Sequence, residues 1–93
     1  MKKEEYKKIA EEQSQEVVKM FNGVDWDIVE DMIKDNKDVV DYFVDEDFID
    51  FDYKDINIGL FKDENNKVHF PMQNVEVWDE EKGKYFSVLT FDN

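Results

Sequence analysis

The sequence contains no cysteine and no arginine, and it has one proline, one histidine and three glycines. The absence of cysteine excludes disulfides, iron–sulfur clusters and thiolate zinc sites, and it fits a reducing compartment. Arginine supplies the planar fork that grips phosphate, so a chain without it is poorly suited to bind nucleic acid directly. The formal net charge of −13 further disfavours contact with nucleic acid or with anionic membranes.

Long apolar runs are missing as well. No segment approaches the roughly 20 apolar residues that a membrane-spanning helix needs. The charged N-terminal run Met1–Glu5 predicts the start of a helix rather than a signal peptide. Abundant lysine and asparagine without arginine also fit the AT-rich coding of a low-GC bacterium or its phages. We therefore expect a cytoplasmic protein that acts in a bacterial host cell and makes no membrane contact.

Catalytic and metal-binding side chains are scarce. The only histidine is His69, which strand alternation places opposite Val68 and Phe70, toward solvent or at a sheet edge. A nucleophilic triad needs a partnered histidine, and no such partner is evident. No window matches the calcium loop D-x-[DN]-x-[DN]-G, because the acidic stretch 45–55 lacks the required glycine. The sequence predicts no enzyme, no cofactor and no metal site.

Apolar and aromatic residues are present in quantity. They make up 41% and 15% of the 93 residues, which is enough bulk for one hydrophobic core. A second core would not fit in a chain of this length, so we expect a single acidic domain over residues 1–93.

Apolar spacing of three to four residues predicts an amphipathic helix over 3–21, ended by Asn22-Gly23. A second apolar stripe follows, and it predicts helices over 25–35 and 37–45. Asn36 would point into the apolar face of a single uninterrupted helix, and asparagine favours turns and caps. One continuous helix and two shorter ones therefore both remain open for this segment.

After Glu46 the apolar period changes to two, which is typical of strands. Strands are predicted over 48–53, 56–61, 67–72, 74–79 and 84–91. Pro71 belongs at an edge or a bulge, because it cannot donate a ladder hydrogen bond. The predicted fold class is α+β, with two or three N-terminal helices packed on a C-terminal antiparallel sheet of four to five strands, arranged as a meander of hairpins.

The negative charge is concentrated in one segment. Residues 25–55 hold thirteen carboxylates and three lysines, which gives −10 of the total −13. If this segment is helical, five of its aspartates form a stripe roughly 27 Å long at about 1.5 Å per residue; they are Asp27, Asp31, Asp38, Asp41 and Asp45. A phosphate backbone presents charge on a similar scale, although a solvated face that aids solubility is the ordinary explanation of such a stripe.

The expected partner-binding residues are acidic residues of this segment together with one aromatic. Trp78 shares a strand face with Glu76, and we expect it to be exposed, ahead of the other interface candidates Phe48, Phe51, Tyr53, Tyr85 and Phe86. The expected set is Asp27, Asp31, Asp35, Asp38, Asp41, Asp45, Glu46, Asp47, Asp50, Asp52 and Trp78.

Three functions fit these features. The first is a small inhibitor of the anti-CRISPR or anti-restriction type, encoded by a phage or mobile element, which acts as a nucleic-acid mimic. It would bind the basic nucleic-acid groove of a DNA- or RNA-processing or defence enzyme. The second is an immunity protein or antitoxin that neutralises a basic nuclease toxin. The third is an adaptor or structural interaction domain whose charge serves only solubility. The expected partner is a basic protein, and pairing of a free strand edge into a homodimer stays open.

Overall fold

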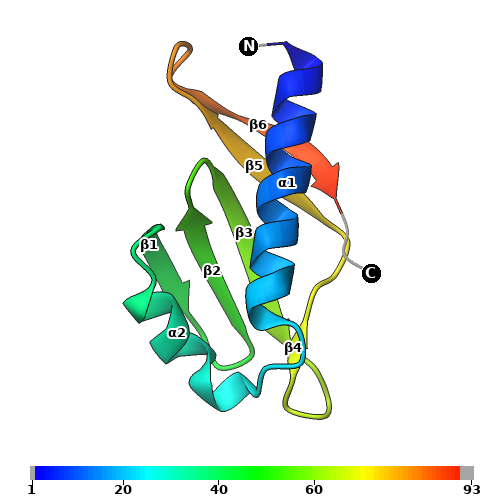
Figure 1. Ribbon diagram of the computed structural model, residues 1–93, viewed down its shortest axis with the longest axis vertical. Helices are drawn as coiled ribbons and strands as arrows, with labels where there is room; N and C mark the ends of the chain where they lie inside the picture. The colour runs from blue at the N-terminus through cyan, green and yellow to red at the C-terminus, as the bar shows by residue number, and fades with distance from the viewer. Residues whose placement is uncertain (1, 91–93) are drawn as a thin grey trace.

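The computed structural model describes residues 2–90, in which helices precede an antiparallel sheet (Figure 1). The helical segments are α1 (Lys3–Phe21), the short 3-10 helix η1 (Trp26–Ile28) and α2 (Val29–Asp35). The strands are β1 (Val39–Val44), β2 (Phe48–Tyr53), β3 (Ile56–Lys62), β4 (Val68–His69), β5 (Gln73–Asp79) and β6 (Lys84–Thr90). Over the described range the fold is thus α+β, as predicted, with six strands instead of four or five.

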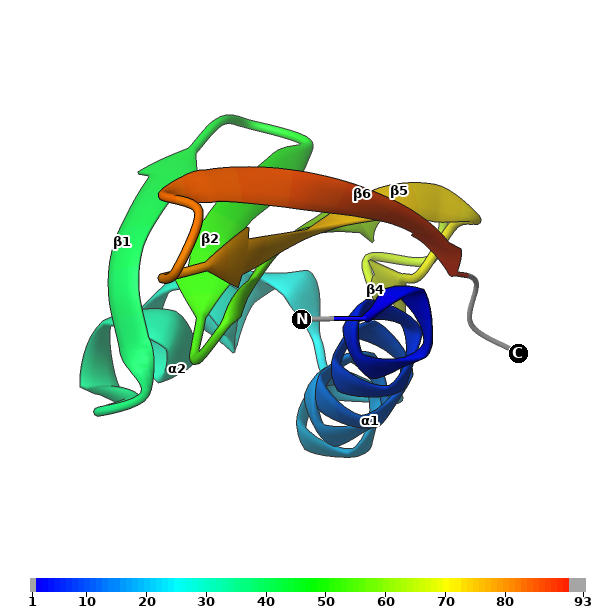
Figure 2. The ribbon, with the colours of Figure 1, turned by 90° about the horizontal axis from the view of Figure 1, so that it is seen from above.

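The strands pair in the order β1-β2-β3-β5-β6, and the short β4 pairs with β3 beyond the end of β5. Figure 2 shows both α-helices on one side of this sheet, which we call the inner face. The opposite side, the outer face, is covered by no helix or strand of residues 2–90. Neither helix in that range combines the length and the apolarity needed to cross a membrane.

Helix α1 has the predicted bounds, and its apolar stripe is the part of it that is buried. Successive turns bury Tyr6, Ala10, Ser14, Val17 and Phe21. The helix stops at Asn22, after which Gly23 takes a φ of +76°. A residue without a Cβ reaches this left-handed conformation at low cost, and glycine is therefore common just after helices.

The core lies between α1, α2 and the inner face of the sheet. Strand alternation buries the inward residues of β2, β3 and β5, while their outward neighbours stay half-buried or exposed. The sheet contributes Ile49, Phe51, Tyr53, Ile56, Ile58, Leu60, Val75 and Val77, and α2 contributes Val29 and Ile33.

Polar contacts fix α1 against the turn between β2 and β3. Gln13 Nε2 donates to Asp55 Oδ2 at 2.8 Å, and Asp55 N donates to Gln13 Oε1 at 3.0 Å. One turn on, Glu16 Oε1 accepts from Lys54 Nζ at 2.6 Å and from the Tyr53 hydroxyl at 2.7 Å. The Lys54 ammonium, and after it the Tyr53 hydroxyl, lowers the pKa of Glu16. These contacts set the position of the helix along the sheet.

The predicted helix over 37–45 is wrong. Helix α2 ends at Asp35, and Asn36 Oδ1 accepts from the backbone N–H of Asp38, which closes a turn. The chain then continues as the edge strand β1, paired with β2 from Val39 to Val44. Asn36 is therefore the break, and the continuous helical stripe of aspartates does not form. The predicted helix over 25–35 is present, but its start is the 3-10 turn η1.

The predicted strand over 67–72 is also shorter than expected, because only Val68–His69 forms β4. Pro71 lies in the break between β4 and β5, as its missing N–H predicts. There the side-chain amide of Gln73 takes the place of backbone hydrogen bonds between β3 and β5. It accepts from Gly59 N at 2.9 Å and donates to Gly59 O at 3.0 Å. We call the short β3–β5 pairing, Ile56 with Val77 and Asn57 with Glu76, the seam. The end of the predicted strand 84–91, residue 91, lies outside the described residues.

One buried group in α1 gives a stability prediction. Ser14 Oγ is buried and has no hydrogen-bond partner among the residues that the structure describes. Ser14→Ala removes this unsatisfied hydroxyl and gains helix propensity, so we expect the free energy of unfolding to rise by about 1 kcal/mol. Urea denaturation measures the change. Ser87→Ala, at an exposed position of β6, is the control and should stay within ~0.5 kcal/mol. A loss of stability on Ser14→Ala would contradict the absence of a partner.

Candidate functional site

The outer face of the sheet collects polar and aromatic side chains from all five long strands. Directly opposed residues in an antiparallel pair point to the same side, so the register defines a row across the sheet. This row runs from Asp41 to Asp52, then to Asn57, Glu76 and Ser87. At about 4.8 Å between strands, the distance from Asp41 to Glu76 is roughly 14 Å.

Four carboxylates lie on this face, and we call them the outer carboxylates: Asp41, Asp50, Asp52 and Glu76. The Asn57 amide holds two of them, because its Nδ2 donates to Asp50 Oδ1 at 2.6 Å and to Asp52 Oδ1 at 2.9 Å. Asp41 is exposed, and the other three are half-buried. Their positions are therefore set by strand pairing and by one amide, which gives a fixed pattern of negative charge.

No lysine neutralises these groups. Within residues 2–90 none of the outer carboxylates is in an ion pair, whereas acids elsewhere do have lysine partners. Examples are Glu30 with Lys34 at 2.6 Å and Asp47 with Lys62 at 3.7 Å. Carboxylates that have no lysine partner can interact favourably with the positive charges of a cationic partner.

Trp78 and Tyr85 stand at one end of the outer carboxylates. They are directly paired across β5 and β6, with ring centroids 4.9 Å apart. Trp78 is 38% exposed, as expected from alternation, and Tyr85 is 46% exposed. Partial burial, and then the charges of Asp52, Glu76 and Asp41, raise the pKa of Tyr85. The tyrosine therefore lies in the electric field of three outer carboxylates.

Three phenylalanines stand at the other end. Phe43, Phe48 and Phe61 come from β1, β2 and β3, and their successive ring centroids are 5.9 and 5.8 Å apart. Phe43 is 60% exposed. Beside Phe48 and Phe61 the surface forms a shallow hollow that Gly59, Met72 and Gln73 also line. The outer face thus has carboxylates in its middle and aromatic rings at both ends, and aromatic side chains are enriched in protein interfaces.

The expected binding residues do not share one surface. Asp41, Asp50, Asp52 and Trp78 lie on the outer face. Asp27, Asp45 and Glu46 line a second hollow at the corner between η1 and the β1–β2 turn, and Asp47 belongs to the same turn. Asp31 and Asp35 are on α2, and Asp38 is in the turn before β1.

The expected set lacks several residues of the outer face, among them Glu76, Tyr85, Phe43, Phe48 and Phe61. Glu76 lies far from the acidic segment in sequence, and only the seam brings it beside Asn57. Tyr85 was one of several aromatic candidates, and its pairing with Trp78 follows from the β5–β6 register. Phe43 falls within the segment 37–45, for which the apolar spacing predicts a helix. The run of β-branched and aromatic residues over 39–44 was the signal that could have placed it on a strand.

No group of three or more His, Asp or Glu side chains in residues 2–90 is arranged to hold a metal ion. Comparisons with protein family models, with curated proteins and with solved structures found no match to this chain.

Proposed function

We propose that the protein binds a basic partner through the outer face and inhibits it as a nucleic-acid mimic, the partner being an enzyme that holds DNA or RNA. The observation that carries this proposal is the fixed row of outer carboxylates without lysine counterions. A groove that binds phosphate presents lysine and arginine side chains, which are the groups that such a row attracts. The mimic is a compact sheet face and not the helical stripe expected from the sequence.

The rest of the charge has a different role in this proposal. The net charge of −13 steers a cationic partner during approach and raises the association rate, most strongly at low ionic strength. The outer carboxylates and the flanking rings of Trp78, Tyr85 and Phe43 make the contact itself. Tryptophan and tyrosine contribute a large share of the binding energy in many interfaces, so affinity depends on both kinds of side chain.

Neutralising three outer carboxylates tests the proposal. The variant Asp41→Asn, Asp52→Asn, Glu76→Gln keeps side-chain size, and we expect it to weaken binding by about tenfold to a hundredfold. Glu11→Gln, Glu12→Gln, Asp35→Asn is the matched control, since it removes the same charge from exposed positions on the helices. Binding and inhibition are measured against a panel of Cas effectors, restriction enzymes, DNA glycosylases and nuclease toxins, at low and at high salt.

Two results would contradict the proposal. One is that no enzyme of the panel is bound at low salt. The other is that both triple variants weaken binding equally, which would assign the effect to net charge alone. If a partner is bound and only Trp78→Ala with Tyr85→Ala abolishes the complex, the adaptor function is favoured over nucleic-acid mimicry.

A further inference from the structure

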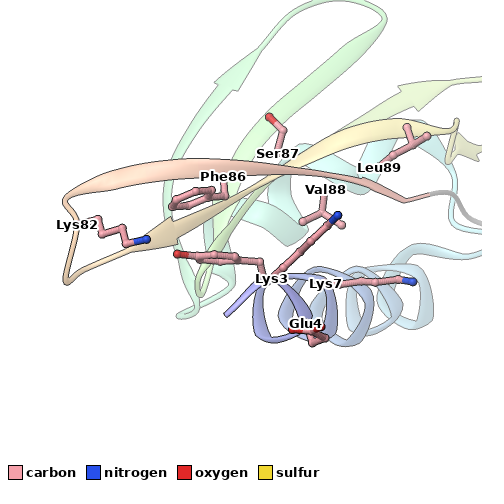
Figure 3. Close-up of a pocket in the computed structure, with 9 residues that line it drawn as sticks. Lys3, Glu4, Lys7, Lys82, Phe86, Ser87, Val88 and Leu89 are labelled. Atoms are coloured by element: carbon pink, nitrogen blue, oxygen red, sulfur yellow. The ribbon is translucent and has the colours of Figure 1, made fainter. Parts of the chain in front are cut away.

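A groove runs between the first turns of α1 and strand β6, and none of the outer carboxylates lines it (Figure 3). Its volume is about 870 Å³. Phe86 and Val88 provide apolar surface on the β6 side, and Tyr6 provides it on the helix side. Tyr6 and Phe86 stack with ring centroids 4.2 Å apart, so two packed aromatic rings form part of the groove wall.

Strand β6 is a free edge of the sheet. Among residues 2–90 it pairs only with β5, in an unbroken register from Gln73 with Thr90 to Asp79 with Lys84. The other edge strand, β1, has a bulge between Val39 and Asp41, a feature that protects edges from further pairing. Strand β6 has neither a bulge nor a proline. Its outward backbone N–H and C=O groups are therefore suited to accept another strand.

Helix α1 continues past this edge (Figure 1). Its inward stripe begins with Tyr6, and the preceding position of that stripe, three residues earlier, is Lys3. Lys3 and Lys7 both line the groove, and Figure 3 shows the Lys3 side chain pointing toward β6 near Val88. The helix thus presents a surface beyond β6 at the place where a further strand would lie.

The lining is cationic in a strongly anionic protein. It contains Lys3, Lys7 and Lys82 against Glu4 alone. Within residues 2–90, Lys3 and Lys82 are in no ion pair, and Lys7 has only a 4.0 Å contact with Glu11. Lys82 Nζ also lies 5.3 Å from the centroid of the Phe86 ring. Three ammonium groups around an apolar floor are complementary to a segment that has both acidic and apolar side chains.

We propose that this groove binds an extended peptide segment of a partner protein, with alternating apolar and acidic residues, as an additional strand beside β6. Backbone hydrogen bonds to the edge supply affinity, while Lys3, Lys7 and Lys82 select the acidic side chains. Strand β6 has no acidic residue, and two chains of charge −13 repel each other, so a second copy is a poorer occupant. A small amphipathic anion would leave the backbone edge unused. The proposal is independent of the function proposed for the outer face.

The test uses a fluorescein-labelled, end-capped octapeptide of alternating valine and glutamate, titrated into the full chain in 150 mM salt. We expect saturable binding by fluorescence anisotropy, together with slower amide hydrogen exchange confined to residues 84–90. An octapeptide of alternating valine and lysine should not bind. The valine–glutamate peptide with N-methylated valines keeps the side chains but loses backbone donors, and it should bind at least about tenfold more weakly.

Charge reversal locates the site. Lys3→Glu, Lys7→Glu, Lys82→Glu should weaken binding of the valine–glutamate peptide by about tenfold or more. The control Lys19→Glu, Lys37→Glu, Lys62→Glu changes net charge equally outside the groove and should stay within about twofold. The proposal is overturned by no binding, by equal loss in both variants, by equal binding of the N-methylated peptide, or by exchange protection away from β6. Sedimentation that shows β6-dependent dimers of the free protein would also overturn it, in favour of a second copy.

Discussion

Phe51→Ala should destabilise the protein strongly, with a loss of about 3–5 kcal/mol in the free energy of unfolding. Phe51 is 1% exposed on the inner face of β2, where its ring meets that of Phe21 edge-on at 6.4 Å. Truncation removes apolar burial and leaves a cavity between the sheet and α1. Domains of this size have a total stability of about 5–15 kcal/mol, so the loss takes a large part of it.

Phe43→Ala is the matched control for this result. It deletes the same side chain from a neighbouring strand, but Phe43 points to the outer face and is 60% exposed. We expect a change within about 0.5 kcal/mol. Urea denaturation followed by tryptophan fluorescence measures both variants. Equal losses would contradict the assignment of inner and outer faces, on which the whole candidate site depends.

Tyr6→Phe is expected to lower the melting temperature more than Tyr53→Phe does, although each removes one hydroxyl. The Tyr6 hydroxyl donates to the carboxylate of Asp79, which is 1% exposed and also accepts from the backbone N–H groups of Glu81 and Lys82. Without that donor the buried carboxylate of Asp79 loses a hydrogen bond. This costs more stability than the loss of one hydrogen bond to a carboxylate that water can reach. Tyr53 donates to Glu16, which is half-buried and keeps Lys54. Differential scanning calorimetry compares the two.

The same pair predicts how stability depends on pH. The hydrogen bond from the Tyr6 hydroxyl is the main cause that lowers the pKa of Asp79. Its contribution to the free energy of unfolding is therefore present above the ordinary pKa of about 3.9, and it is lost as pH falls through the lower pKa of the folded state. Burial, and then the bond to Asp79, raises the pKa of Tyr6 to about 12. That contribution is present below about pH 10 and is lost as pH rises toward 12.

Calorimetric scans across pH check both signs. Tyr6→Phe should remove the loss of stability at alkaline pH that ionisation of Tyr6 causes. It should also make the loss of stability at acid pH less steep, because the pKa of Asp79 is then closer to its ordinary value. A variant whose pH profile runs parallel to that of the wild type from acid to alkali would show that the two groups are not coupled.

The elements with an unambiguous apolar period could be predicted from the sequence. Helix α1 and strand β2 have the bounds predicted for them, 3–21 and 48–53. In α1 the apolar stripe and the Asn22-Gly23 stop agree with each other, and in β2 the alternation from Phe48 to Tyr53 has no helical alternative. Local pattern and tertiary packing require the same conformation in these segments.

The segment 39–44 shows where such reasoning stops. Val39, Val40 and Phe43 have helical spacing and follow a true helix, yet the run is rich in β-branched and aromatic residues. Pairing with β2 across the sheet decides between the two conformations, and that contact is absent from any local window. The composition located the negative charge correctly. The pairing register of the strands decides which carboxylates lie on the same face. It places Glu76 beside residues of the acidic segment, whereas Asp31 and Asp41 lie on different parts of the surface.

The seam between β3 and β5 has a consequence for how the chain folds. Because those strands meet at only two register pairs, the hairpins on either side of the seam depend on α1 to hold them in one structure. The contact from Tyr6 to Asp79 joins residues 73 positions apart, and closing so large a loop is slow compared with forming a hairpin. The ribosome synthesises α1 well before β5 and β6. The apolar stripe of the helix therefore stays exposed to solvent until these strands are made and pack against it.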